Sequence, residues 1–259
     1  MLNQKINAYL RSMKWLAYIH TIQIFFGYIL AVWPNFGLNN IYMMIVLFLI
    51  FGPLLHGGIY TLNDIFDIEE DKKHPLKRKR PIASGQLSLV EGYIFSSFLI
   101  AAALIASYLV NPILVYICFL FIAINLLYSL ILKKIPYMDI ITNSITHPLR
   151  FYTGVIAAGV FSFHSLALFI TLLSLSLCAL KRKKELMENQ EKSRAVLGYY
   201  TQASLTYFMA IMGMLIFLLT ILSRSLNLYF GIIICILFLI IIVGYHKIKL
   251  IQRFINKLY

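Results

Sequence analysis

The sequence predicts an all-α protein, a polytopic bundle of transmembrane helices. Its 259 residues are 61% hydrophobic and 15% aromatic, and their mean hydropathy is +0.82. The apolar runs are long enough to cross a bilayer, which takes about 20 residues for each helix. The short segments of alternating hydrophobicity that are typical of a membrane β-barrel do not occur in the sequence.

Eight apolar runs predict eight membrane-spanning helices, and we expect the whole chain, residues 1–259, to form a single domain. The first run is long and no small-residue cleavage site follows it, so we expect no cleavable signal peptide. Gly52-Pro53 is expected to break or thin the second helix, and His147-Pro148 the fifth. The eight spans are approximately residues 15–33, 41–62, 90–110, 112–132, 137–160, 163–180, 198–222 and 227–246.

The distribution of charge predicts the orientation of the bundle. If the N-terminus lies inside, the inner segments carry all but two of the 23 lysines and arginines, the exceptions being Arg150 within a span and Arg224 in an outer loop. This is the positive-inside bias, which predicts cytoplasmic termini and cytoplasmic charged loops at 63–89 and 181–197. The net charge of +13 therefore reports membrane topology, and we expect no nucleic-acid partner.

The segment 63–71 predicts a metal site. It holds half of the chain's ten acidic residues. Asp64, Asp67 and Asp71 are spaced i, i+3, i+7, and Asn63 precedes Asp67 by four residues, so on a helix these oxygens converge along one face. Mg²⁺ prefers such oxygen ligands and often takes its remaining ligands from substrate phosphates. A solvated charged loop is the alternative, but it would rarely place its carboxylates in helical register.

A basic block follows the acidic segment at once. Lys77, Arg78 and Arg80 supply positive charge that suits the oxygens of a diphosphate. We therefore expect these three side chains to bind a diphosphate group next to the metal.

A second charged cluster follows the sixth predicted span. Lys181 and Glu185 are spaced i, i+4, so one helical face shows a cation and a carboxylate together. Lys181 and Arg182 are candidates for phosphate binding, and Glu185 is a candidate ligand of a second metal. A cytoplasmic cap that merely obeys the positive-inside rule is the alternative.

Two ionisable residues lie at or within the fifth predicted span. Ionisable groups in a span usually face a cavity or a partner, so Arg150 is a candidate for binding an anionic substrate group. A direct pair with Asp139 is not expected, because eleven residues of helix separate them by about 16 Å along the axis. Three histidines are expected to satisfy local hydrogen bonds rather than to bind metal, namely His20, His56 and His147.

The acidic segment resembles the first motif, N-D-x-x-D-x-x-x-D, of the UbiA superfamily of intramembrane prenyltransferases. Residues 74–85 resemble its polyprenyl-phosphate phosphoribosyltransferase branch. Further positions resemble that branch as well: Tyr128-Ser129, Leu132-Lys133, Asp139, Arg150, Lys181-Arg182-x-x-Glu185-Leu186, Arg194, Leu197, Tyr200 and Thr201. The family typically has nine helices, whereas eight spans are predicted here. The second aspartate motif that is common in its aromatic prenyltransferases is replaced here by the Lys/Arg/Glu cluster.

The resemblance implies a Mg²⁺-dependent membrane transferase that displaces diphosphate from an activated donor, with an isoprenoid lipid as a substrate. It implies catalytic roles for Asp67, Asp71 and Arg150. The favoured reaction is transfer of phosphoribosyl from phosphoribosyl diphosphate to polyprenyl phosphate. The alternative is transfer of a prenyl chain from prenyl diphosphate to an aromatic or lipid acceptor. A transporter or a non-catalytic membrane scaffold is the hypothesis from another class, and the sequence leaves the oligomeric state open.

Overall fold

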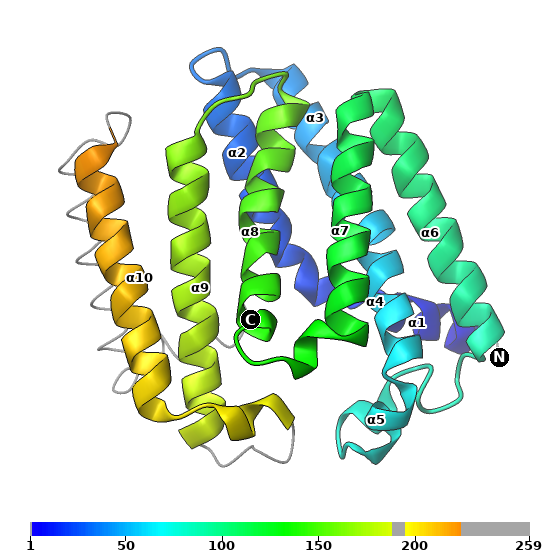
Figure 1. Cartoon of the computed structure of the whole chain (residues 1–259). Helices are drawn as coiled ribbons and strands as arrows, with labels where there is room; N and C mark the ends of the chain where they lie inside the picture. Colours follow the sequence, from blue (N-terminus) through cyan, green and yellow to red (C-terminus); the bar gives the residue numbers. More distant parts are fainter. Residues whose placement is uncertain (1, 188–194, 224–259) are drawn as a thin grey trace. The chain divides into compact units, whose positions relative to one another are not determined.

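The structure, a computed structural model, describes residues 2–187 and 195–223. Every regular element in these residues is helical, which confirms the predicted all-α class (Figure 1). The described residues form two compact units. Unit 1 runs to Leu130 and adds residues 149–161, and unit 2 comprises residues 131–148 and those from Ser162 onward. We describe each unit by itself.

Unit 1 begins with short helices that lead into the first long span. The elements are α1 (Leu2–Ser12), the 3-10 helix η1 (Trp15–Thr21), α2 (Ile22–Val32), α3 (Leu38–Leu49), the π-helix η2 (Ile50–His56) and α4 (Gly57–Phe66). The segment from α3 to α4 is one apolar helix of 29 residues. Its expected irregularity at Pro53 is confirmed, because this proline lies inside the π-helical stretch.

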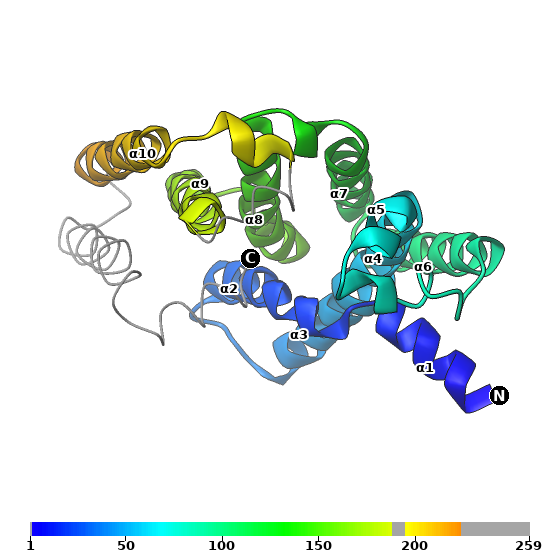
Figure 2. The same cartoon turned by 90° about the horizontal axis from the view of Figure 1, so that it is seen from below.

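The rest of unit 1 carries the charged segment and two further spans. The elements are α5 (Ile68–Lys73), η3 (Lys77–Lys79), α6 (Leu89–Val110), α7 (Pro112–Leu130) and the end of α8 (Met138–Ala157). A capping box, in which Ser88 and Glu91 satisfy each other's backbone N–H groups, fixes the start of α6. In Figure 2, α1 lies beside α4 and α6, where the ring of Tyr9 contacts the ring of Phe95 on α6.

The core of unit 1 joins α2, η2 and α7 through buried side chains such as Ile24, Phe51 and Phe121. Helix α2 also approaches the end of α8 so closely that backbone meets backbone. A Cβ atom built on Gly154 would lie 1.9 Å from the carbonyl oxygen of Ile24, and one built on Gly27 would lie 2.1 Å from that of Phe151. Only glycine fits these two positions.

Unit 2 contains η4 (Leu132–Lys134), the first part of α8, α9 (His164–Met187), η6 (Ala195–Tyr199) and α10 (Gln202–Leu222). Helices α9 and α10 pack side by side (Figure 1). The core of unit 2 includes Ile140, Leu180, Leu197 and Leu205. Helix α8 continues through Pro148, so the helix does not break at this proline.

Five helical segments of the described residues are long and apolar enough to cross a membrane: Leu38–Phe66, Leu89–Val110, Pro112–Leu130, His164–Met187 and Gln202–Leu222. A shorter apolar segment covers Tyr18–Val32. The predicted span at 227–246 lies outside the described residues. The number of eight spans and the cytoplasmic side of the termini therefore stay predictions.

Candidate functional site

The acidic motif lies at the junction of α4 and α5. The backbone N–H of Asp67 donates to the carbonyl of Asn63 at 2.9 Å, and that of Asp71 donates to the carbonyl of Asp67 at 2.8 Å. Helical hydrogen bonding therefore continues through the junction, although Asp67 itself has φ −91° and ψ 4°. The helical register that the spacing predicts is kept, and it brings Asp64 and Asp71 to the same side.

Arg80 joins these two carboxylates. Its Nη1 donates to Oδ1 of Asp64 at 3.0 Å and to Oδ2 of Asp71 at 2.7 Å. Both carboxylates are 1% exposed. Their other oxygens, Oδ2 of Asp64 and Oδ1 of Asp71, are buried and accept no hydrogen bond from the described part of the chain. Buried carboxylate oxygens without a donor favour binding of a cation or of further donors.

Lys14 is a second cation that contacts Asp64. The sequence analysis did not identify Lys14 as a site residue. Its ammonium donates to Oδ1 of Asp64 at 2.6 Å and lies 5.5 Å from the ring centre of Tyr60. Lys14 sits between α1 and η1 with φ 51° and ψ 51°, a left-handed conformation that is uncommon for a lysine. Burial lowers the pKa of the Lys14 ammonium, and the Asp64 carboxylate opposes that shift.

The other two oxygen ligands expected in the motif have different surroundings. Oδ1 of Asn63 accepts a hydrogen bond from Oγ of Ser129 on α7 at 2.9 Å. Asp67 is half-buried at the helix junction. For Asp71, burial raises the pKa of the carboxyl, against the opposing effect of Arg80.

The basic block covers the end of α5 and the turn after it. The backbone N–H groups of Leu76 and Lys77 donate to Nδ1 of His74, which holds this turn. The ammonium of Lys77 lies 4.0 Å from Oδ1 of Asp71. Arg78 is exposed. Of the three predicted diphosphate ligands in this block, Arg80 and Lys77 thus contact the acidic motif directly.

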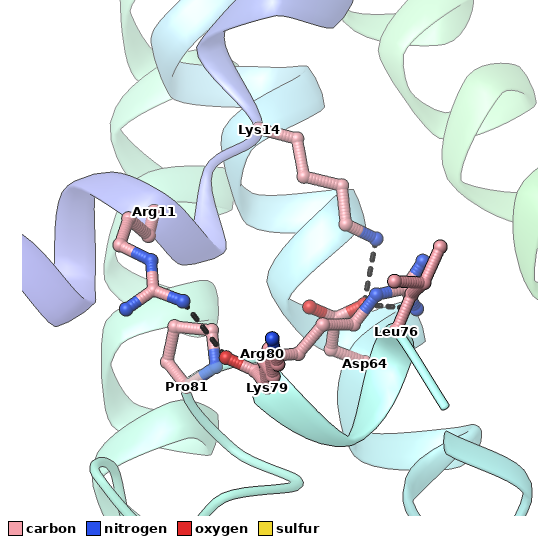
Figure 3. Close-up of a pocket in the computed structure, with 7 residues that line it drawn as sticks. All are labelled: Arg11, Lys14, Asp64, Leu76, Lys79, Arg80 and Pro81. Atoms are coloured by element: carbon pink, nitrogen blue, oxygen red, sulfur yellow. Dashed lines mark hydrogen bonds and ion pairs between the residues drawn. The ribbon is translucent and has the colours of Figure 1, made fainter. Parts of the chain in front are cut away.

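A pocket of about 330 Å³ opens beside Asp64 (Figure 3). In Figure 3, Lys14 and Arg80 lie on the side of Asp64, and Arg11 approaches from the opposite side. Nη2 of Arg11 donates to the backbone carbonyl of Lys79 at 2.8 Å, and Nη1 donates to Oε1 of Gln86 at 3.3 Å. The lining residues are Arg11, Lys14, Asp64, Leu76, Lys79, Arg80 and Pro81.

The acidic motif fits a magnesium ion that completes its coordination with substrate. Within the described ranges, no group of three or more His, Cys, Asp or Glu side chains is placed to hold a metal by itself. Asp64 and Asp71 offer two carboxylates with oxygens that lack a donor. Mg²⁺ is commonly bound through one or two carboxylates, with water and substrate phosphates as its other ligands. The pair has the chemistry that such an ion takes, and its binding here stays a prediction.

Arg150 is buried in unit 1, at 6% exposure. Its Nη2 lies 3.2 Å from Nε2 of His56, and its guanidinium lies 5.6 Å from the ring centre of Phe121. Nδ1 of His56 is hydrogen-bonded to the carbonyl of Phe51. That carbonyl requires the proton on Nδ1, so Nε2 is the acceptor for Arg150. The prediction that His56 satisfies local hydrogen bonds is confirmed.

The second charged cluster forms a buried network in unit 2. Nε of Arg182 donates to Oδ2 of Asp139 at 2.5 Å, and its Nη1 donates to Oε2 of Glu185 at 3.0 Å. The hydroxyl of Tyr200 donates to Oδ1 of Asp139 and accepts from the backbone N–H of Tyr137 at 2.7 Å. Arg182 is 2% exposed and Asp139 is fully buried. Both carboxylates therefore balance the charge of Arg182 inside the protein.

Asp139 accepts from Arg182 in unit 2, and Arg150 lies against His56 in unit 1. Lys181 lies half-buried on α9, one residue before Arg182. Its role in phosphate binding, like that of Glu185 in metal binding, stays a prediction.

Residues 21–253 match the UbiA prenyltransferase family. A decaprenyl-phosphate phosphoribosyltransferase of Corynebacterium glutamicum is 33% identical over 155 residues, which cover 58% of this chain and 47% of that protein. A digeranylgeranylglyceryl phosphate synthase of Methanococcoides burtonii is 39% identical over 84 residues, which cover 32% of this chain and 29% of that protein. The chain thus spans about half of the length of these relatives, or less.

A solved structure has the same fold. The UbiA homologue from Archaeoglobus fulgidus bound to GPP and Mg²⁺ superposes on this chain with a TM-score of 0.72, at 19% identity, over 92% of this chain and 85% of that one. Together with the five apolar helices of the described residues, the match to the family identifies an integral membrane protein. The family that the N-D-x-x-D-x-x-x-D motif indicated is confirmed: this chain belongs to the UbiA prenyltransferase family.

Proposed function

We propose that this protein is a Mg²⁺-dependent membrane transferase that displaces diphosphate from an activated donor and uses an isoprenoid substrate. The observation that carries the proposal is the pair of buried carboxylates, Asp64 and Asp71, held by Arg80 beside a basic pocket. Carboxylates suit the metal and the surrounding cations suit the diphosphate, so the two halves of a metal–diphosphate site lie next to each other.

The favoured reaction is phosphoribosyl transfer from phosphoribosyl diphosphate to polyprenyl phosphate. A phosphate oxygen of the lipid attacks C1 of the ribose, the bond from C1 to the diphosphate oxygen breaks, and diphosphate leaves with both bonding electrons. Support comes from the phosphoribosyltransferase relatives of Corynebacterium glutamicum and Mycolicibacterium smegmatis, which are 33% and 32% identical over their matched stretches.

The chain's residues have distinct tasks in this reaction. Asp64 and Asp71, with Asn63 and Asp67, would hold the metal, which when bound would supply positive charge to the leaving diphosphate. Arg80, which bridges Asp64 and Asp71, would bind the diphosphate beside them. Lys77 and Arg78 would bind further oxygens of that group. These charges are already in place before the reaction, and electrostatic stabilisation of a transition state is largest when the charges are preorganised in this way.

Arg150 is proposed to bind an anionic group of the substrate from within the bundle. His56 directs the guanidinium, because its Nε2 accepts from Nη2 of Arg150. In unit 2, Lys181 is proposed to bind phosphate and Glu185 to serve a second metal. Arg182 is proposed to bind phosphate together with Lys181, and its Nη1 also holds the carboxylate of Glu185 at 3.0 Å.

The second candidate is transfer of a prenyl chain from prenyl diphosphate to an aromatic or lipid acceptor. It is favoured by the Methanococcoides burtonii relative, a digeranylgeranylglyceryl phosphate synthase. The same metal and cations would serve, because both reactions expel diphosphate from a carbon that gains positive charge.

Competition between two labelled donors separates the two reactions. The full chain in lipid nanodiscs receives radiolabelled phosphoribosyl diphosphate and radiolabelled geranylgeranyl diphosphate, with Mg²⁺ and with three acceptors: polyprenyl phosphate, a glyceryl phosphate lipid and an aromatic acid. We expect the phosphoribosyl label to enter the lipid fraction. Entry of the prenyl label alone would establish the second candidate, and turnover of neither donor would contradict the proposal.

A pair of variants tests the role of the acidic motif. Asp67→Ala should abolish turnover at every Mg²⁺ concentration while the protein still melts at its usual temperature. Glu69→Gln removes a carboxylate from the same segment, but Glu69 is exposed and pairs with Lys72, so turnover should stay normal. Equal activity of both variants would show that the motif does not serve catalysis.

A further inference from the structure

The pocket beside Asp64 carries more positive charge than its own carboxylate balances. Four cationic side chains line it against one carboxylate, that of Asp64. Its volume of about 330 Å³ falls within the range of roughly 300–1,000 Å³ that is typical of small-molecule sites. A pocket of this charge and size suits a multiply charged anion.

The cations of the pocket fall into two groups. Lys14 and Arg80 direct their nitrogens to Asp64, at 2.6 and 3.0 Å. Arg11 lies away from that carboxylate (Figure 3) and is instead held by the backbone carbonyl of Lys79 and by Gln86. Among the ion pairs of the described residues, Asp64 is joined to Lys14 and Arg80 and not to Lys79. The first group lies at the proposed metal–diphosphate position, and the second is available to another anion.

Arg11 and Lys79 still have donors to offer. A guanidinium has five N–H groups, and Arg11 uses one each for the carbonyl of Lys79 and for Gln86. The ammonium of Lys79 is exposed and makes no ion pair with a carboxylate elsewhere in residues 2–187 and 195–223. A guanidinium fork beside an ammonium is a favourable pair for phosphate oxygens.

We propose that Arg11 and Lys79 form a subsite for a phosphate monoester, next to the position of the leaving diphosphate and separate from it. The inference rests on the proposed function and deepens it, because it requires a substrate that carries a phosphate monoester in addition to the diphosphate. Phosphoribosyl diphosphate carries one at C5 of its ribose, and polyprenyl phosphate carries one on the lipid. A prenyl diphosphate with an aromatic acceptor carries none.

Calorimetry with the full chain in nanodiscs and Mg²⁺ tests the subsite. The probes are phosphoribosyl diphosphate, inorganic diphosphate, ribose 5-phosphate and a short-chain polyprenyl phosphate. Arg11→Gln and Lys79→Gln should each weaken phosphoribosyl diphosphate and ribose 5-phosphate by about tenfold, the loss expected for one charged donor to phosphate. Their affinity for inorganic diphosphate should change by less than about twofold, since that probe lacks the monoester.

Lys73→Gln is the matched control. Lys73 is exposed in the same charged segment but does not line the pocket, so its loss should leave all four affinities unchanged. Arg11 also braces a backbone carbonyl, and Lys79→Gln, which removes only an exposed ammonium, keeps the test valid if Arg11→Gln melts early.

The outcomes are distinct. A loss for the two sugar phosphates assigns the subsite to the donor, and a loss for polyprenyl phosphate alone assigns the same subsite to the acceptor lipid. Equal weakening of phosphoribosyl diphosphate and inorganic diphosphate, or no change for any probe, overturns the subsite. A separate result would contradict the proposed function itself: in the same calorimetry, the unaltered protein would bind neither phosphoribosyl diphosphate nor polyprenyl phosphate.

Discussion

The ammonium of Lys14 lies 2.6 Å from Oδ1 of Asp64, the carboxylate that also accepts from Arg80. Lys14, from before the first apolar helix, and Arg80, from the turn after α5, thereby meet on one buried oxygen of Asp64. Helix α1 is positioned for this contact by Ser12, whose hydroxyl accepts from Oγ1 of Thr61 on α4 at 3.2 Å. The N-terminal segment is therefore part of the candidate site.

A double-mutant cycle measures this contact. Lys14→Met and Asp64→Asn should show a coupling free energy of about 1–2 kcal/mol in thermal or denaturant unfolding, because the carboxylate is buried and the two groups touch. The exposed pair of Lys72 and Glu69 serves as the control, and its coupling should be clearly smaller. Additive effects of the first two variants would show that Lys14 does not stabilise Asp64.

Removal of Arg80 should destabilise the protein and make it dependent on magnesium. Arg80→Met leaves Asp64 and Asp71 buried with less compensation, which we expect to cost about 2–4 kcal/mol of unfolding free energy. Saturating Mg²⁺ should restore part of that loss, since the ion binds the folded state alone. Melting curves with and without chelator measure both effects, with Arg78→Met, an exposed neighbour, as the control. If the melting temperature of Arg80→Met does not change with Mg²⁺, the proposed metal site is contradicted.

The buried network of unit 2 should depend on the shape of Arg182 as well as on its charge. Arg182→Met leaves Asp139 buried and uncompensated, at a cost of about 3–5 kcal/mol. Arg182→Lys should recover little, because one ammonium cannot copy the fork that reaches Asp139 and Glu185 at once. The unfolding free energies of the two variants, compared with Lys183→Met, test this. Full stability of Arg182→Met would rule out the structural role.

The contact between α2 and α8 should be intolerant of any side chain. Gly154→Ala places a Cβ 1.9 Å from the carbonyl oxygen of Ile24, and we expect it to lower the unfolding free energy by about 1–3 kcal/mol or more. Gly198→Ala is the control, since its added Cβ meets no atom within 4 Å. Similar melting temperatures of the two variants would show that the helices separate without cost.

The sequence predicted those features of the site that depend on local spacing. Asp64 and Asp71 lie seven residues apart, and the helical bonds across Asp67 place them on one side, where Arg80 joins them. That register follows from the residues alone. Arg80 is close in sequence as well, so its proximity to the carboxylates was foreseeable.

Contacts between distant segments could not be predicted in the same way. Lys14 meets Asp64 only because α1 folds against α4, and Arg182 meets Asp139 across 43 residues. Long spans such as α6, α7 and α10 are apolar on every side, so their sequences lack the periodic stripe that marks a buried face and do not reveal which helices pack together. A lone charge in the right place was the available signal: Lys14 precedes the first apolar run, and Asp139 begins a helix that is otherwise uncharged up to Arg150.

The π-helix at Ile50–His56 has a consequence for the orientation of the acidic motif. Each residue of an α-helix turns the chain by about 100°, and a π-helical turn accommodates an extra residue. If the same residues formed an uninterrupted α-helix, everything after this stretch would be rotated by about that angle, and Asp64 would face away from Lys14 and Arg80. Deletion of one residue here would let the stretch become α-helical and would leave the direction of the acidic motif unchanged. The direction of the carboxylates is thus fixed by a helical phase shift more than one turn upstream.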